Sequence, residues 1–272
     1  MKQKIINWLN EYKETTNCKG VVLGISGGKD STVVAMLSKL VFGEDVFGVI
    51  MPNGVQSDID DAIQICETLN LKYSIVNIGK AYDALLGSIE YKTVKDYETL
   101  DRTIVDNGPK ISDKARTNVP PRLRMTTLYA IAQTLGYRVI GTGNASERYI
   151  GWFTKYGDGG CDVNPIAHLT CTEVVELGKE LCEEFDLPVD LIVKKPADGL
   201  TGKSDEENFG FTYEQLDKRI MYGSSGDKNL DKKLAKMHLL ARHKVELPNT
   251  YGNDILNVSR LIKDIDEDKV DY

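Results

Sequence analysis

Eight consecutive residues, GISGGKDS at positions 24–31, combine groups that bind phosphate with a group that binds a metal ion. The stretch consists of Gly24, Ile25, Ser26, Gly27, Gly28, Lys29, Asp30 and Ser31. Glycines let main-chain N–H groups approach an anion, and the serines and the lysine add donors and positive charge. A carboxylate repels bare phosphate, so Asp30 predicts a divalent cation, Mg²⁺, between the two. The alternative is that Asp30 or Ser31 only caps a helix and the glycines only form a turn.

The elements around this stretch predict where it lies in the fold. Short apolar, β-branched runs predict strands at 21–25, 46–51, 73–78 and 137–142. Helical periodicity separates or follows them at 31–42, 57–70, 79–90 and 114–135. This alternation predicts an α/β fold with a doubly wound, open parallel sheet and helices on both faces, which is Rossmann-like. GISGGKDS then lies at the carboxyl end of the first strand, where such sheets bind ligands and where a helix N-terminus attracts anions.

The rest of the chain contains further helical patterns and two predicted loops. Residues 1–20 have the pattern of an amphipathic helix, and helical patterns recur at 172–185, 212–221 and 229–243. The glycine-rich and charged segments 155–163 and 198–210 predict loops, the second of them a mobile lid. We find no repeat or linker, so we expect one domain over residues 1–272.

Composition excludes several classes of protein. Hydrophobic residues make up 41% of the chain, and the formal charge is −7, which disfavours general binding to nucleic acid or anionic membranes. No apolar run approaches the ~20 residues of a membrane span, and no signal peptide is evident, so we expect a cytoplasmic protein. The five cysteines form no C-x-x-C pair, which favours reduced thiols over disulfides or a zinc site.

Three further stretches carry candidate ligand-binding groups. GTGNASE follows a predicted strand, so Thr142 and Glu147 emerge beside the phosphate loop, and Glu147 can share the metal with Asp30. Alternatively, Glu147 is only an acid favoured in the first turn of a helix. PPRLRM places Arg122 and Arg124 near the start of a helix whose later residues, 128–135, look buried. There they gain nothing from the helix dipole, so they predict an anionic partner, unless they form a solvated face.

The segment TKYGDGGCD is too rich in glycine for a helix or a central strand. It carries Lys155, Asp158 and Asp162, and we interpret it as a loop built for close approach to a ligand, with a plain surface loop as the alternative. Near the end of the chain, His243 and Lys244 form a short HK pair. Such a pair at a helix end often only compensates the helix dipole.

Taken together, these motifs resemble a known family. A Walker A loop is excluded by spacing, because residue 23 is Leu and Asp30 follows Lys29. The pattern S-G-G-x-D-S resembles instead the pyrophosphate loop of the N-type ATP pyrophosphatases, which cleave ATP between its α- and β-phosphates and have the adenine-nucleotide alpha hydrolase-like fold. With NVPPRLRM, GTGNASE, FTKYGDGGCDVNPI, SDEE and HK in order, the chain resembles the ammonia-dependent NAD synthetases from residue 24 to about 244.

The resemblance implies an enzyme that converts deamido-NAD to NAD, the last step of NAD biosynthesis. ATP adenylates the nicotinate carboxylate with release of pyrophosphate, and ammonia then displaces AMP. Such ligases use Mg²⁺, have no glutaminase domain, and form homodimers. Roles at matching positions are catalysis for Ser26, Asp30 and Lys155, and ATP binding for residues 24–31 and Thr142. Metal binding is implied for Asp30 and Glu147, and deamido-NAD binding for Arg122, Lys155, Asp162, His243 and Lys244.

Two positions depart from the family pattern. Cys171 stands where relatives often have a lysine near ATP, and Ala197 stands where Ser or Thr is common. Lys194, Lys195 or Lys203 are candidates to replace the missing charge. Two other functions share part of the pattern. A tRNA-modifying enzyme with the same loop needs a basic extension or a catalytic cysteine pair, and a nucleotide sensor has no need of both Asp30 and Glu147.

Overall fold

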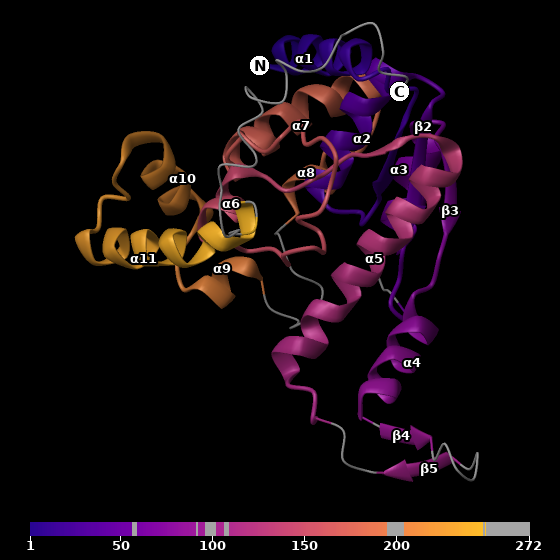
Figure 1. Cartoon of the computed structure of the whole chain (residues 1–272). Coiled ribbons are helices and arrows are strands. Elements are labelled where there is room, and N and C mark those ends of the chain that lie inside the picture. The colour runs from indigo at the N-terminus through magenta and orange to yellow at the C-terminus, as the bar shows by residue number, and fades with distance from the viewer. Residues whose placement is uncertain are drawn as a thin grey trace, which may run out of the picture.

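A four-stranded parallel sheet lies at the centre of the protein (Figure 1). The computed structural model describes residues 1–55, 59–90, 92–95, 102–105, 109–194, 204–246 and 248. In spatial order the strands are β3 (Lys72–Ile75), β2 (Val46–Ile50), β1 (Val21–Gly24) and β6 (Arg138–Val139). Val21 of the central strand β1 lies opposite Val46 on one side and Arg138 on the other. The four strands and their parallel order confirm the predicted α/β fold.

Helices cover both faces of this sheet, as the sequence predicts. On one face lie α1 (Lys2–Thr15), α2 (Lys29–Phe42), α3 (Ile59–Thr68), α7 (Cys171–Phe185) and α8 (Asp190–Val193). They enclose a core in which Leu9, Leu37 and Ile65 are fully buried. On the other face lies α5 (Asp113–Leu135), where Ala132 packs with Val22 and Val139 of the sheet, and α4 (Gly79–Glu90) packs beside α5.

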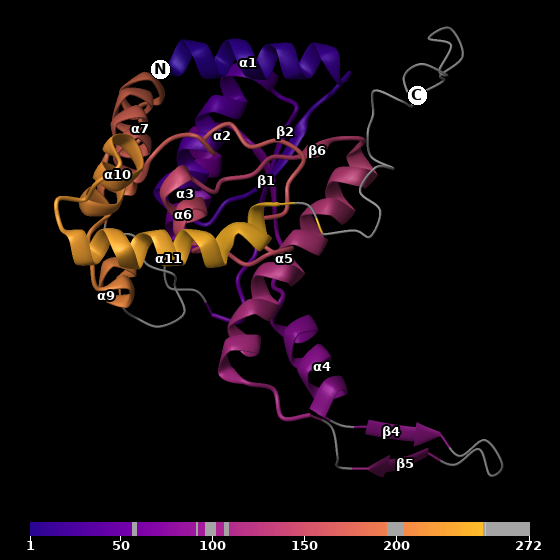
Figure 2. The ribbon, with the colours of Figure 1, turned by 60° about the vertical axis from the view of Figure 1, so that its left-hand side comes forward.

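Two structures extend from this body (Figure 2). The helices α6 (Ala145–Ile150), α9 (Asp205–Phe209), α10 (Tyr213–Tyr222) and α11 (Lys228–Val245) form a separate apolar cluster around Phe209 and Leu234. Beyond the far ends of α4 and α5, the antiparallel strands β4 (Lys92–Lys95) and β5 (Arg102–Val105) form a hairpin. Among the described helices, none combines the length and the apolar character that a membrane crossing requires.

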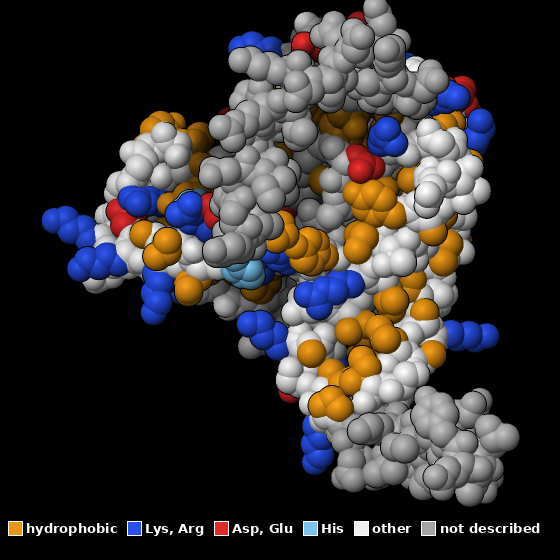
Figure 3. Space-filling model, viewed as in Figure 1, with side chains coloured by type: hydrophobic (Ala, Val, Ile, Leu, Met, Phe, Trp, Pro, Cys, Tyr) orange, Lys and Arg blue, Asp and Glu red, His pale blue; other side chains and the backbone are white. Residues whose placement is uncertain are grey.

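The long helix α5 differs from the sequence interpretation in two ways. Ser112 caps it, and Pro120 and Pro121 lie inside it, so Arg122 and Arg124 are in mid-helix and not near the start. Residues 128–135 are mostly half-buried or exposed, and only Ala132 among them is buried. Apolar side chains consequently show on the surface over this helix (Figure 3). The prediction of a buried second half was wrong, because α5 covers the sheet with only one of its faces.

Two further boundaries differ from expectation. Strand β6 has only two paired residues, and Ile140 then forms an isolated bridge to Val163. Within the expected loop 198–210, residues 205–209 form helix α9, whose capping box joins Ser204 and Glu207. The S-x-x-E pattern is the local signal for such a helix start, and the glycine content of the segment hid it. Residues 198–203 of the predicted lid lie outside the described part of the chain.

Candidate active site

The GISGGKDS stretch forms the junction between β1 and α2, as predicted. Gly24 is the last residue of β1, Gly27 has a φ of +77°, and Gly28 is the N-cap of α2. A positive φ disfavours any residue with a Cβ, which explains glycine at position 27. The hydroxyl of Ser26 accepts a hydrogen bond from the Gly28 N–H at 3.2 Å and lies 3.0 Å from that of Ser31. The loop is thus held in shape by its own serines at the positive end of a helix.

The two charged residues of the loop pair with one another. Lys29 Nζ lies 2.6 Å from Asp30 Oδ2, and the two side chains are only 5% and 18% exposed. The ammonium also lies 5.7 Å from the centre of the Tyr213 ring. Burial by itself lowers the pKa of Lys29, but Asp30, Cys171 and Glu147 together outweigh it, so the pKa is raised and the lysine stays charged.

Asn144 joins this pair to Glu147. Its side-chain amide donates to Asp30 Oδ1 at 2.9 Å, and its Oδ1 accepts from the Glu147 N–H at 3.0 Å. The carboxylate of Glu147 in turn accepts from the Asn144 N–H at 3.1 Å, which completes a capping box at the start of α6. Burial, and then the negative charge of Asp30, raise the pKa of Glu147. Glu147 is therefore the first-turn acid of α6 and also lies near enough to Asp30 for its charge to act, while its sharing of a metal ion stays a prediction.

Asp217 of α10 connects the start of α6 to the start of α7, and the sequence analysis did not find it. Its buried carboxylate accepts hydrogen bonds from Ser146 Oγ and from the N–H and hydroxyl of Thr172, the latter two at 2.9 and 2.6 Å. Ser146 Oγ accepts in addition from the Cys171 N–H at 2.8 Å. The start of α7 and the helix that carries Glu147 are thus fixed to one acid. No local pattern signals this, because Asp217 lies 71 and 45 residues from Ser146 and Thr172.

The carboxylates of Asp30 and Glu147 have the chemistry of an Mg²⁺ site. They follow the adjacent strands β1 and β6, and the charge of Asp30 acts on Glu147. Mg²⁺ is usually held by one or two carboxylates, with waters and substrate phosphates as the other ligands. Among the described residues, no group of three or more His, Cys, Asp or Glu could hold a metal ion alone. The two carboxylates fit a cation whose other ligands come from water and a phosphorylated ligand.

A second group of predicted residues meets where α5, residues 151–155 and the end of α11 come together. Arg122 Nε donates to the carbonyl of Lys155 at 3.3 Å, and Lys155 Nζ donates to the carbonyl of His243. Lys244 Nζ donates to the carbonyls of Gly151 and Phe153 at 2.6 and 2.7 Å. Within the described part of the chain, none of these three cations forms an ion pair with a carboxylate. Their positive charge suits an anionic ligand.

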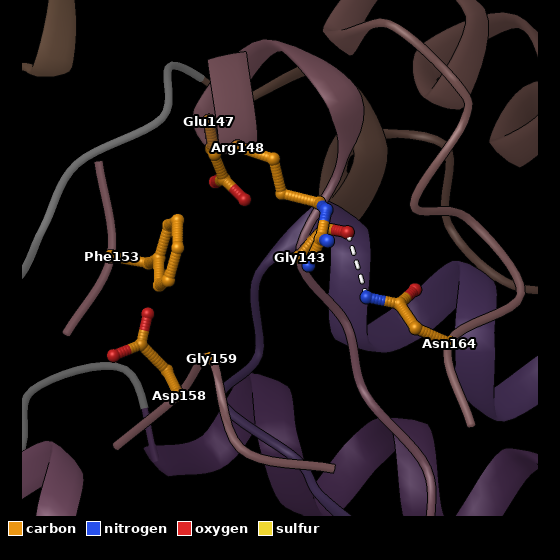
Figure 4. A pocket seen from close by; sticks show the side chains of 7 residues that line it. All are labelled: Gly143, Glu147, Arg148, Phe153, Asp158, Gly159 and Asn164. Atoms are coloured by element: carbon orange, nitrogen blue, oxygen red, sulfur yellow. Dashed lines mark hydrogen bonds between the residues drawn. The ribbon is translucent and has the colours of Figure 1, made fainter. Parts of the chain in front are cut away.

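The glycine-rich loop 155–163 connects the two groups. A Cβ on Gly159 would lie 2.5 Å from the Phe153 ring, so this close packing requires glycine. A small pocket opens beside that ring, with Glu147 on one side and Asp158 on the other (Figure 4). The loop therefore carries the second group to the edge of the first. This confirms that 155–163 is a loop, in which Asp158 accepts from the Thr154 N–H at 2.9 Å, and its approach to a ligand stays a prediction.

Other predicted residues lie elsewhere or have other partners. Asp162 uses one carboxylate oxygen to accept from Tyr129 OH at 3.2 Å and the other to accept from the Val139 N–H at 2.7 Å. Thr142 follows β6 and is half-buried, while Arg124 donates to the carbonyl of Met51 at 3.0 Å.

Three lysines are candidates to supply the charge that Cys171 lacks, namely Lys194, Lys195 and Lys203. Lys194 is paired with Asp61 at 2.8 Å, and Lys195, Ala197 and Lys203 lie outside the described residues. The charge of Lys29, by contrast, is close enough to act on the Cys171 thiol.

Comparison with known proteins agrees with this geometry. The sequence model of the family described as NAD synthase matches residues 1–249. An NH(3)-dependent NAD(+) synthetase of Carboxydothermus hydrogenoformans is 42% identical over 248 residues, which cover 90% of this chain and 94% of the relative. The solved structure of an NMN synthetase from Francisella tularensis is 33% identical, with a TM-score of 0.77 over 92% of this chain and 97% of that one.

A second solved structure extends the agreement. The NH3-dependent NAD synthetase of Campylobacter jejuni has 27% identity and a TM-score of 0.71, and the match covers 92% of this chain and 96% of that one. The family match, the extended identity and the shared fold all span the elements that carry both groups of candidate residues. The chain belongs to the NAD synthase family.

Proposed function

We propose that this chain is an ammonia-dependent NAD synthetase that amidates the nicotinate carboxylate of deamido-NAD at the expense of ATP. The observation that carries the proposal is the loop 24–31 at the end of β1, joined through Asn144 to Glu147 at the end of β6. A loop of this kind supplies N–H groups and a helix N-terminus for phosphates, and the two acids suit the accompanying cation. The curated relative and the Campylobacter jejuni structure are both named NH3-dependent, which supports free ammonia as the nitrogen donor.

In this proposal the first group of residues binds ATP. Residues 24–31 enclose the β- and γ-phosphates, and Thr142 binds the nucleotide from the end of β6. Asp30 and Glu147 hold Mg²⁺, which when bound neutralises phosphate charge. Ser26 shapes the loop and stands ready to donate to a phosphate oxygen. These groups lower the barrier by fixing donors where negative charge develops on the leaving pyrophosphate.

The reaction proceeds in two displacements, and neither needs a covalent bond to the enzyme. The nicotinate carboxylate oxygen attacks the α-phosphorus, and the bond to the bridging oxygen of the β-phosphate breaks, which releases pyrophosphate. Ammonia then attacks the activated carbonyl carbon, loses a proton and displaces AMP, which leaves the amide of NAD. Lys155 lies between Arg122 and the segment of His243. Its ammonium is placed to hold the negatively charged substrate near the reacting carboxylate.

The second group binds the dinucleotide. Arg122, Lys155 and Lys244 offer cations that are bonded only to main-chain carbonyls among their hydrogen-bond partners in the described chain. Such cations match the pyrophosphate bridge and the carboxylate of deamido-NAD. We include His243 and Asp162 in this site, although the Asp162 carboxylate must exchange a bond to Tyr129 or Val139 to reach a ligand.

The decisive test is the stoichiometry of the reaction. Protein incubated with ATP, Mg²⁺, ammonia and deamido-NAD should form NAD, AMP and pyrophosphate in equal amounts. Formation of ADP in place of AMP would refute the mechanism. Glutamine offered in place of ammonia should support little turnover by the chain alone.

A second substrate is favoured by one comparison. The Francisella tularensis structure is named an NMN synthetase, so nicotinate mononucleotide is the alternative acceptor for the same chemistry. The same assay with the mononucleotide and the dinucleotide in competition distinguishes the two. The acceptor with the higher kcat/KM is the physiological class, since this ratio measures discrimination.

We also propose a cytoplasmic homodimer. Support comes from the surface of α5, where Leu123, Leu128 and Ile131 are only partly buried and Leu135 is 41% exposed. Apolar side chains gathered on one face are a frequent sign of an interface. Sedimentation equilibrium should give twice the monomer mass, and a charged substitution, Leu135→Glu, should shift the equilibrium toward monomer.

A further inference from the structure

Lys29 occupies an unusual position, because it is a buried cation bound to a residue that is expected to hold another cation. Its side chain is 5% exposed, and its ammonium lies 2.6 Å from Asp30 Oδ2. Lysine is rarely buried unless its charge is matched, since removal of an ammonium from water is costly. Asp30 is thus the counter-ion of Lys29 in this structure.

The second oxygen of Asp30 is engaged as well. Asn144 donates to Oδ1 at 2.9 Å, so each carboxylate oxygen faces one proton donor. A divalent cation that binds Asp30 at close range needs an oxygen lone pair, and it repels an ammonium at the same atom. The amide of Asn144 is neutral and can share Oδ1, whereas Lys29 is in direct competition at Oδ2.

From this geometry we propose that Lys29 is an exchangeable counter-ion, which leaves Asp30 when Mg²⁺ binds and then pairs with the polyphosphate of ATP. This inference rests on the proposed function, because it takes ATP and Mg²⁺ as the ligands of the loop. It adds a coupling between them that the loop motif alone does not contain.

The surroundings of Lys29 explain why the released ammonium turns to the nucleotide. Lys29 is the first residue of α2, directly after the Gly28 N-cap, so its side chain leaves the helix at the end where phosphate is expected. Around it lie the ring of Tyr213 and the thiol of Cys171, and neither is an anion that could replace Asp30. Glu147 is near enough to act on its charge, but Glu147 is itself a ligand of the same cation in the proposed site. The incoming triphosphate is then the remaining partner.

This exchange has a thermodynamic consequence that can be measured. Without nucleotide, a metal ion has to separate Lys29 from Asp30 and leaves the lysine buried and unpaired, so its affinity is low. With ATP present, the lysine gains a new partner, and the metal ion binds more tightly. By linkage, the metal raises the affinity for ATP by the same factor, and such couplings are typically about 5- to 150-fold.

The experiment uses Mn²⁺ as a spectroscopic substitute for Mg²⁺ and measures free Mn²⁺ by electron paramagnetic resonance. Wild-type protein and Lys29→Met are titrated with Mn²⁺ in the absence and presence of the non-hydrolysable α,β-methylene analogue of ATP. Methionine keeps the length of the buried chain and removes its charge. Lys39→Met is the matched control, because Lys39 lies on the same helix and pairs with Glu44 at 2.7 Å, far along α2.

The expected result is reciprocal. Without nucleotide, Lys29→Met should bind Mn²⁺ about tenfold more tightly than wild type, while the nucleotide analogue at saturating Mn²⁺ should bind about tenfold more weakly. Lys39→Met should match wild type in both titrations. Equal Mn²⁺ affinity of Lys29→Met and wild type in the absence of nucleotide would refute the exchange, even if wild type makes NAD normally. If wild type bound neither Mn²⁺ nor the analogue, the proposed function itself would be refuted.

A measurement on the wild-type fold covers the case in which Lys29→Met does not fold. The side-chain ¹⁵N spectrum should contain one protected lysine ammonium signal that is missing in Lys29→Arg. Saturation with Mg²⁺ should abolish its protection, and addition of the nucleotide analogue should restore a protected signal at a new frequency. A signal that stays unchanged through both additions, or the absence of any protected signal lost in Lys29→Arg, contradicts the proposal.

Discussion

The two groups of candidate residues treat charge in opposite ways. In the group proposed to bind ATP, here called the nucleotide group (residues 24–31, Asn144 and Glu147), the Lys29 ammonium is neutralised by Asp30, and both side chains are largely buried. In the group proposed to bind deamido-NAD, here called the dinucleotide group (Arg122, Lys155, His243 and Lys244), the two lysines donate only to neutral main-chain carbonyls among their hydrogen-bond partners in the described chain. Under the exchange proposed above, the first group changes partners when a metal ion and a phosphate bind, whereas the second keeps cations that form no ion pair among the described residues.

This difference follows from how each group is built. Lys29 and Asp30 are adjacent in the chain, and a short loop places them together before any ligand arrives. The dinucleotide group draws on segments 88 and 93 residues apart, and its cations are positioned by carbonyls of those segments. Local construction permits a direct ion pair inside the loop, whereas the long-range construction positions Lys155 and Lys244 on carbonyls, and Asp158 acts on the charge of Lys244 without forming an ion pair with it in the described residues.

The largest expected effect comes from removing the charge of Asp30, the proposed metal ligand. Asp30→Asn should lower NAD formation by about 10²- to 10³-fold, because the amide cannot balance a divalent cation while it still accepts from Asn144. The fold should remain intact by circular dichroism. Asp60→Asn, an exposed acid in the first turn of α3, is the control and should keep full activity. Activity close to wild type at low Mg²⁺ would contradict a role for Asp30 in metal binding.

A change in the dinucleotide group should affect the KM for the dinucleotide and not the KM for ATP. Lys244→Ala should raise the KM for the dinucleotide about 10- to 100-fold and leave the KM for ATP unchanged, because one charge-assisted contact is lost. Burial lowers the pKa of Lys244, so its charge, and with it the affinity, should be lost at a lower alkaline pH than for an ordinary lysine. Lys236→Ala, at an exposed position of the same helix, should change neither constant. An equal rise of both KM values would show that the groups are not independent.

The hydrogen bonds of Asp217, which lie next to the nucleotide group, can be tested through the stability of the protein. Asp217→Ala removes three hydrogen bonds from a side chain on a residue that is 2% exposed, and it should lower the free energy of unfolding by about 2 to 3 kcal/mol. Urea denaturation measures this difference. Glu176→Ala, which removes an exposed acid of α7, should have a much smaller effect. If the two variants unfold at the same urea concentration, the hydrogen bonds of Asp217 do not stabilise the junction between α6, α7 and α10.

The smallest effect concerns the thiols. Of the five cysteines only Cys161, in the loop beside the dinucleotide group, is partly exposed, while the other four are buried. Burial raises the pKa of Cys66 and of Cys171 to about 12 in each case, so their thiolate fractions at pH 8 are very low. Iodoacetamide followed by mass spectrometry should therefore modify Cys161 first in native protein. Faster modification of Cys171 would contradict the closed structure of the nucleotide group.

Much of the fold could be predicted from the chain because its signals are local. The strands at 21–25 and 46–51 are apolar runs, and the glycines and serines of 24–31 specify the loop between β1 and α2 within a few residues. Periodicity failed where it depends on packing. It could not show that α5 covers the sheet with one face only, or that residues 205–209 form a short capped helix within a charged segment.

The sequence by itself determined the glycine-rich loop at 24–31, the family pattern and the alternation of strands and helices around the central sheet, because residues within about one turn of each other dictate turns, caps and strand ends. Only the tertiary structure decided the partners of the charged groups. It brought Asn144 and Glu147 to Asp30 and placed Asp217 against Ser146. Contacts between segments far apart in the chain depend on how the helices pack against the sheet, and no local pattern of residues encodes that arrangement.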